Sequence, residues 1–226
     1  MTDIIEKLTV WAIPLIFAIT LHEAAHAWVA YKLGDNTAKS MGRVSFNPMV
    51  HIDLFGTVLL PLMLLISGSG FLFGYAKPVP VNFSRLNNPR RDSVLVALAG
   101  PGANIILIMI AVILFYTLSI IPGFAQEWFV KNLFNMILIN AVLAVFNMLP
   151  IPPLDGGRVA VGILPYALAR PLSKLEPYGM LIILGLIFII PMAGRYLGMD
   201  LNILWSIIGP VISFITEFAF SLLPVA

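Results

Sequence analysis

Five long apolar stretches are the feature of this sequence that most restricts its fold. A transmembrane helix needs about 20 mostly apolar residues, because each residue rises about 1.5 Å across a hydrocarbon core of about 30 Å. The candidate spans are Leu8–Leu33, Val94–Ile121, Leu133–Leu149, Gly179–Gly194 and Leu201–Leu223. Hydrophobic residues make up 60% of the chain and charged residues only 11%, against about 45–50% and about 25% in soluble domains. The sequence therefore predicts an all-α polytopic integral membrane protein with five full transmembrane helices in a lipid bilayer.

One further apolar stretch, Leu54–Ala76, is too interrupted for an ordinary span. It contains Pro61 and the tetrapeptide Ser67–Gly70, which divide it into short arms. We therefore expect a re-entrant segment, which must be covered by protein or line a cavity because its backbone groups need partners. A full crossing is the alternative. The polar loop before it is a candidate for short strands around Arg43–Phe46, in a small membrane-associated β-sheet.

Composition excludes several classes of protein. The chain has no cysteine, which removes disulfides, thiol nucleophiles, iron–sulfur clusters and cysteine-ligated zinc. Its formal net charge of +2 is too small to suggest nucleic-acid binding, so no nucleic-acid partner is expected. We expect one membrane-embedded domain over residues 1–226, with its core at 8–160 and additional transmembrane helices within 178–223.

A cluster of ionisable groups lies in the second half of the first apolar stretch, in the motif His22-Glu23-Ala24-Ala25-His26. Two histidines four residues apart lie on one face of a helix, so both imidazoles can reach one metal ion. Glu23 lies too far round the helix to complete that ligand set, but it is positioned to take a proton from attacking water. Ordinary polar side chains are the alternative interpretation. It is weaker in a membrane, where ionisable groups are costly and usually mark a site.

A catalytic zinc site needs a third protein ligand and an open position. The choice lies between His51, the remaining histidine, and Asp155, which follows an apolar helix in the segment Pro150–Arg158. Asp155 is favoured, because the prolines end the helix and the glycines after it let the backbone turn sharply beside the carboxylate. Taken alone, Leu154–Gly157 is more simply interpreted as a tight turn or a helix N-cap.

Together these motifs resemble the site-2 protease family of intramembrane zinc metalloproteases. The resemblance rests on the His22–His26 motif, on Asn147 upstream of Leu154-Asp155-Gly156, and on Ala99-Gly100-Pro101 in an apolar helix. The segment Asn47–Asp53 is similar to the compact prokaryotic branch of the family, and there is no room for the inserted PDZ domain of many relatives. The resemblance covers most of the chain.

The resemblance implies one Zn²⁺ ion held by His22, His26 and Asp155, with Glu23 as general base. It also implies that Asn147 lies near the active site and helps to bind substrate or stabilise the oxyanion. The expected reaction is hydrolysis of a peptide bond in or next to the transmembrane segment of a protein or peptide substrate, as in regulated intramembrane proteolysis. The alternatives are a membrane metal-binding protein or transporter without protease activity, and a catalytically silent scaffold.

Three other polar residues have less specific interpretations. His51 and Asp53 either support the metal site, as outer partners or as a gate at its cytoplasmic mouth, or they hydrogen-bond within an interfacial turn. The two interpretations have equal weight. Asn104 is expected to hydrogen-bond between helices, with packing favoured over catalysis.

A shared ion restricts the topology, because its ligands must lie at the same membrane depth. The helices that place His26 and Asp155 must run in the same direction, so Leu54–Ala76 must not cross the membrane. Ten of the thirteen Lys and Arg residues then fall on one side, which the positive-inside rule makes cytoplasmic. The expected location is the inner membrane of a prokaryotic cell, with the active site toward the cytoplasmic side.

Overall fold

The computed structural model describes residues 2–59, 62–63 and 76–224, and these residues are helical or irregular, with no strand among them. Five helical stretches are long and apolar enough to span a membrane. They are Leu8–Lys32, Pro89–Phe115, Gly123–Asn147, Glu176–Tyr196 and Ile203–Ser221. The predicted all-α fold with five spans is confirmed, and the chain is an integral membrane protein.

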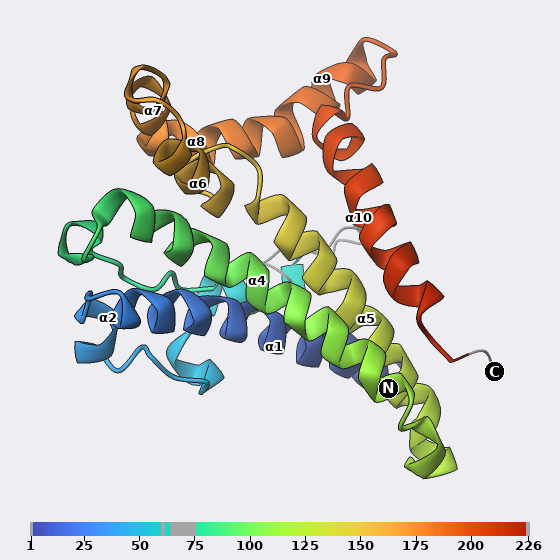
Figure 1. Cartoon of the computed structure of the whole chain (residues 1–226). Coiled ribbons are helices and arrows are strands. Elements are labelled where there is room, and N and C mark those ends of the chain that lie inside the picture. Colours follow the sequence, from blue (N-terminus) through green and yellow to red (C-terminus); the bar gives the residue numbers. More distant parts are fainter. Residues whose placement is uncertain (1, 60–61, 64–75, 225–226) are drawn as a thin grey trace.

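Three long helices form the core, and the other elements are arranged around them (Figure 1). The core helices are α1 (Thr2–Lys32), α4 (Pro89–Phe115) and α5 (Gly123–Asn147). The short elements before α5 are α2 (Thr37–Ser40), η1 (Pro48–Val50), η2 (Leu54–Leu59), η3 (Phe83–Arg85) and η4 (Leu118–Ile120). After α5 follow α6 (Asp155–Ile163), α7 (Tyr166–Ser173), α8 (Glu176–Leu184), η5 (Gly185–Ile189), α9 (Ile190–Tyr196) and α10 (Ile203–Ser221).

The directions of the core helices follow from the hydrogen bonds that join them. α4 runs antiparallel to α1, because its early residue Val96 bonds to the late residue His26 of α1. α5 runs parallel to α1, because Lys131 of α5 pairs with Glu6 of α1, and four residues later on both helices Asn135 Nδ2 donates to the Val10 carbonyl. The late part of α1 and the end of α5 therefore lie at the same end of the molecule, as ligands on α1 and at the start of α6, which follows α5, would require.

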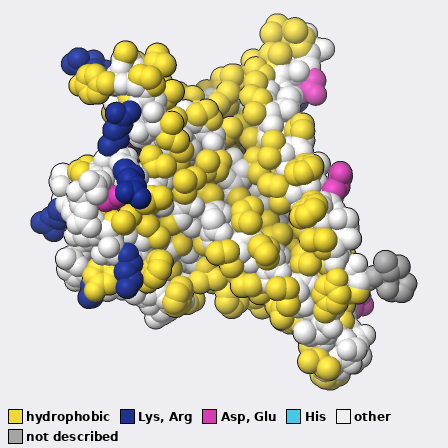
Figure 2. Space-filling view, viewed as in Figure 1, with side chains coloured by type: hydrophobic (Ala, Val, Ile, Leu, Met, Phe, Trp, Pro, Cys, Tyr) yellow, Lys and Arg dark blue, Asp and Glu magenta, His cyan; other side chains and the backbone are white. Residues whose placement is uncertain are grey.

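The core helices are apolar on both their inner and outer sides. On α4, Ile108 and Ala111 are buried in a hydrophobic cluster shared with α5 and α10, whereas Ile106 and Ile113 are exposed. Figure 2 shows hydrophobic side chains over most of the visible face. A helix that is apolar all round is stable when its outer side faces lipid, so these exposed side chains match a bilayer environment.

Most of the predicted re-entrant segment, Leu54–Ala76, lies outside the described residues, but the chain on either side of it is described. The Lys77 N–H donates to the His51 carbonyl over 2.9 Å, and the Arg43 guanidinium donates to the Lys77 carbonyl over 2.7 Å. A single crossing would separate these residues by about 30 Å, the thickness of the hydrocarbon core. The described residues His51 and Lys77, which flank this segment, therefore lie side by side and not a membrane thickness apart.

The short strand expected around Arg43–Phe46 is wrong, because this stretch is irregular backbone. Its polar groups are engaged locally. The Arg43 N–H closes a turn over Gly42, where a φ of +67° favours glycine, and the Ser45 carbonyl accepts from the His51 ring. These local bonds replace the ladder that a strand at this position would need.

Candidate metal centre

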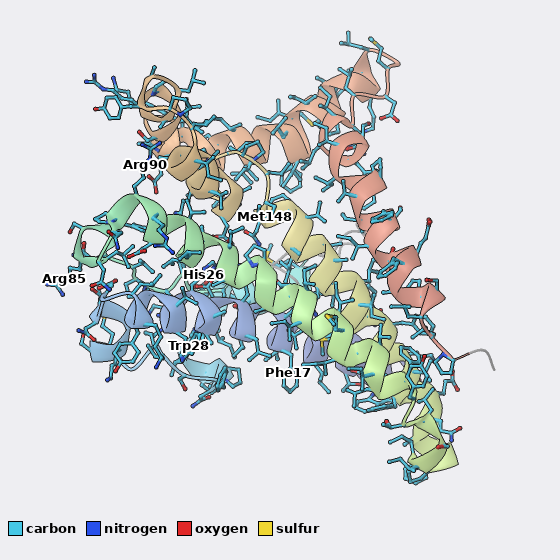
Figure 3. All side chains as sticks on the ribbon, in the orientation of Figure 1. Phe17, His26, Trp28, Arg85, Arg90 and Met148 are labelled. Atoms are coloured by element: carbon cyan, nitrogen blue, oxygen red, sulfur yellow. The ribbon has the colours of Figure 1, made fainter. Side chains whose placement is uncertain are left out.

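Three side chains converge between α1 and the start of α6. The ligand atoms of His22, His26 and Asp155 all lie within 4.8 Å of one another. The two Nε2 atoms are 3.0 Å apart, and Asp155 Oδ2 lies 3.2 Å from His22 Nε2 and 3.3 Å from His26 Nε2. In Figure 3, His26 points from α1 into the interior of the molecule, whereas Trp28 on the same helix is 53% exposed. The structure thus brings together three residues that the sequence singled out as ligands.

The hydrogen bonds of the two Nδ1 atoms determine which nitrogen of each histidine ring carries the proton and which has a free lone pair. His26 Nδ1 lies 2.7 Å from the Val96 carbonyl, which can only accept, so Nδ1 carries the proton and Nε2 has a free lone pair. His22 Nδ1 lies 2.6 Å from Asn104 Oδ1, which is also an acceptor. Both Nε2 atoms therefore present lone pairs to the same space.

The cluster fits a bound cation for two reasons. Two imidazole lone pairs and a carboxylate oxygen face one another, and the buried Asp155 Oδ2 has no hydrogen-bond partner among the described residues. Three acceptors without a donor repel, and a cation removes that repulsion. In addition, Gly100 on α4 leaves open space where a Cβ would collide with the Nε2 atoms of both histidines. Two imidazole nitrogens and one carboxylate are a donor set typical of catalytic zinc.

Two glycines allow Asp155 to reach the cluster. α6 packs directly against the turn that follows α5, and a Cβ on Gly156 would collide with the Met148 carbonyl. A Cβ on Gly157 would collide with the backbone nitrogen of Pro152. Neither glycine has a positive φ. The expectation that they permit a sharp turn is therefore corrected, because their role is to let two backbone segments approach closely.

Glu23 lies on α1 beside the cluster and contacts a different part of the chain. Its Oε2 accepts a hydrogen bond of 2.7 Å from the Val79 N–H. The segment that contains Val79 is held at two more points, because the Lys77 N–H donates to the His51 carbonyl and the Asn82 N–H donates to the Asp35 carboxylate. The backbone amide of Val79 thus fixes the position of the Glu23 carboxylate.

The structure gives local partners to His51 and Asp53. His51 is fully buried and its Nε2–H donates to the Ser45 carbonyl over 2.8 Å, while its Nδ1 has no partner among the described residues. Burial lowers the pKa of the His51 imidazole, because the charged form is poorly solvated there. Asp53 Oδ1 accepts from the Gly56 N–H at the start of η2. These bonds favour the interpretation of an interfacial turn, and a supporting role at the metal site stays a prediction.

Three asparagines show where sequence reasoning was incomplete. Asn147 donates to the Leu143 carbonyl of its own helix, and a role for it in substrate binding stays a prediction. Asn104 does join helices, but its contact with His22 was not foreseen. Asn140, which accepts a bond from Asn104, was missed entirely. The signal that could have identified Asn140 was an asparagine in the middle of an apolar span, where polar groups need partners.

The sequence profile of peptidase family M50 matches residues 10–126 and 118–190. The chain belongs to peptidase family M50. YwhC of Bacillus subtilis (strain 168), named as a zinc metalloprotease, is 40% identical to this chain over 197 residues, which cover 84% of each of the two proteins. Rip2 of Mycolicibacterium smegmatis, also named as a zinc metalloprotease, is 28% identical over 182 residues, which cover 80% of this chain and 67% of Rip2. Rip2 of Mycobacterium tuberculosis (H37Rv) is 27% identical over 183 residues, which cover 81% and 68%.

No solved structure matches this chain significantly. The family and its relatives make the chain a site-2-type zinc metalloprotease, as the motifs predicted. Zinc is accordingly its cofactor.

Proposed function

We propose that this protein hydrolyses a peptide bond in or next to the transmembrane segment of a membrane protein, in regulated intramembrane proteolysis. The observation that carries this proposal is the position of the metal-ligand cluster. His22 and His26 belong to the span Leu8–Lys32 and are buried among the core helices. A peptide bond must therefore enter the membrane-embedded core to reach them, and a substrate that already lies in the bilayer can do so.

In this proposal His22, His26 and Asp155 hold the zinc ion. Bound zinc polarises the scissile carbonyl and makes water a better nucleophile. The Glu23 carboxylate takes the proton of the attacking water and returns it to the leaving amine. The Val79 N–H keeps that carboxylate beside the site. Asn147 helps to bind substrate or to stabilise the oxyanion.

Two variants test the ligand assignment. We expect Asp155→Ala to lose zinc and all cleavage, because one of three ligands is removed, and His51→Ala to keep zinc, because its ring is engaged with Ser45. Metal analysis of the proteins purified in detergent gives the first readout. The second is cleavage of synthetic single-span peptides in lipid vesicles, mapped by mass spectrometry. Zinc retained by Asp155→Ala would refute the ligand set, and cuts only far from the apolar span would refute intramembrane cleavage.

The same proposal includes an orientation, with the active site toward the cytoplasm across a prokaryotic inner membrane. In Figure 2 Lys and Arg side chains gather at the end of the molecule that carries α2, the start of α4 and α7. Lys131, an exception toward the other end, forms ion pairs of 2.7 Å with both Glu6 and Glu127, which offset its charge. This asymmetry supports a cytoplasmic position for the basic end.

Single cysteines can report this orientation, because the natural chain contains none. We expect Asn87→Cys to react with an impermeant thiol reagent only from the cytoplasmic side, and Gln126→Cys only from outside. Both positions are exposed, so labelling should report sidedness and not burial. Labelling of Asn87→Cys in intact cells would contradict the proposed orientation.

We further propose that residues 1–226 act as one membrane-embedded protease domain. Its core at 8–160 carries all three proposed ligands, and the helices within 178–223 pack around it. The contact of α10 with α5 supports this division.

A further inference from the structure

We propose that Asn140 is a positioning residue that sets the tautomer of His22 through Asn104. A chain of hydrogen bonds runs from α1 through α4 to α5. His22 Nδ1 lies 2.6 Å from Asn104 Oδ1, and Asn104 Nδ2 donates to Asn140 Oδ1 over 2.8 Å. Asn140 Nδ2 then donates to the Met136 carbonyl over 2.8 Å. The inference rests on the proposed role of His22 as a zinc ligand.

Both asparagines are fully buried in the membrane-spanning core, each with 0% of its surface exposed. An amide at such a position must find its partners within the protein, because an unpaired buried polar group is costly. The partners observed here are other side chains and backbone carbonyls. The orientation of one amide therefore constrains the orientation of the next.

The Met136 carbonyl fixes the direction of the chain. A carbonyl can only accept, so the Asn140 atom that faces it is Nδ2, and Asn140 Oδ1 faces α4. Asn104 must then present Nδ2 to that oxygen, which leaves Asn104 Oδ1 for His22. An oxygen at this position requires a proton on His22 Nδ1. The lone pair of His22 is consequently on Nε2, where the proposed zinc site needs it.

A flipped Asn104 amide would have the opposite effect. It would present Nδ2 to His22 Nδ1, which would favour a proton on Nε2 and block metal binding. The Ala18 carbonyl also accepts from Asn104 Nδ2, but at 3.4 Å, so the 2.8 Å bond to Asn140 is the main restraint on the amide. His26 differs, because a backbone carbonyl holds its Nδ1 directly.

The variant Asn140→Leu tests the inference, since leucine has a similar size and no polar atom. We expect zinc affinity, measured by competition with a chelator in detergent, to fall about 10-fold. Asn132→Leu is the matched control. Asn132 is also buried on α5 and donates to a backbone carbonyl four residues earlier, that of Trp128. Its zinc affinity should equal that of the wild type. Asn140→Asp keeps an oxygen for Asn104 and should retain affinity close to that of the wild type.

A double variant separates this role from general damage to the fold. Asn104→Leu interrupts the chain before Asn140, so adding Asn140→Leu should cause no further loss of zinc affinity. Nitrogen-15 NMR of the metal-free protein gives a direct readout, because the chain has three histidines. We expect a protonated Nδ1 on His22 in the wild type and a mixture of tautomers in Asn140→Leu.

Several outcomes would overturn the inference. They are unchanged zinc affinity in Asn140→Leu, equal losses in Asn140→Leu and Asn132→Leu, additive losses in the double variant, or an unchanged His22 tautomer. His22→Ala distinguishes these outcomes from failure of the ligand assignment. If His22→Ala retains zinc, the proposed function is wrong in its ligands. If it loses zinc while Asn140→Leu does not, only the role of Asn140 is wrong.

Discussion

Glu23→Gln is expected to keep its zinc and to lose proteolysis by about 10²–10⁴-fold. Glutamine has nearly the same size as glutamate, and its side-chain oxygen can still accept from the Val79 N–H, so the 2.7 Å contact can persist. What the variant lacks is a group that can take a proton from water at neutral pH. The loss should therefore appear in the rate of cleavage and leave metal content unchanged.

The measurement compares initial rates on one single-span peptide in vesicles at equal, metal-analysed enzyme concentrations. Glu6→Gln is a suitable control, because Glu6 lies on the same helix near its opposite end and pairs with Lys131. Its cleavage rate should stay near that of the wild type. Near-normal cleavage by Glu23→Gln would remove Glu23 from the mechanism.

Gly100→Ala is expected to weaken zinc binding severely although it adds only one methyl group. The new Cβ would lie 2.5 Å from His22 Nε2 and closer still to His26 Nε2, so both rings would have to shift from the positions in which they face Asp155. Displacing two ligands should weaken zinc binding by more than about 100-fold, the upper range for loss of an outer partner. Chelator competition and metal analysis measure the effect.

Gly102→Ala provides the matched control for this variant. It makes the same change two residues later on α4, where nothing lies within 4 Å of the added Cβ. Zinc binding and cleavage should therefore be unchanged, and alanine also favours the helix over glycine. Equal zinc content in Gly100→Ala and the wild type would show that the site has more room than the distances allow.

The sequence predicted the spans and the His22–His26 pair because both depend on local patterns, whereas Asp155 was added from the turn around it and from the family resemblance. Helix ends were less accurate. The helix predicted to begin at Val94 begins at Pro89, since Pro89 suits a first helical position and the Asp92 carboxylate accepts from the Asn88 N–H. A search for apolar residues alone omits this polar first turn. For the same reason, the helix predicted from Leu133 begins ten residues earlier, at Gly123.

Contacts between distant segments could not be predicted in the same way. The bond between Glu23 and Val79 joins positions 56 residues apart, and the bond between His22 and Asn104 joins positions 82 residues apart. No spacing rule connects such pairs, since they depend on how α1, the 77–82 segment and α4 pack. For the same reason, the sequence did not predict that a side chain at position 100 would collide with His22 and His26, although the Ala99–Pro101 motif had drawn attention to this position.

The position of Asp155 at the start of α6 has a consequence for biosynthesis. With the proposed ligands, the first two are made in α1, but the third is made only after α4 and α5 have been synthesised. A nascent chain that has inserted these three helices still lacks the carboxylate, so it cannot yet hold zinc with the full ligand set. The ribosome would thus deliver an inactive precursor into a membrane full of other proteins, and hydrolytic competence would arise only when α6 docks.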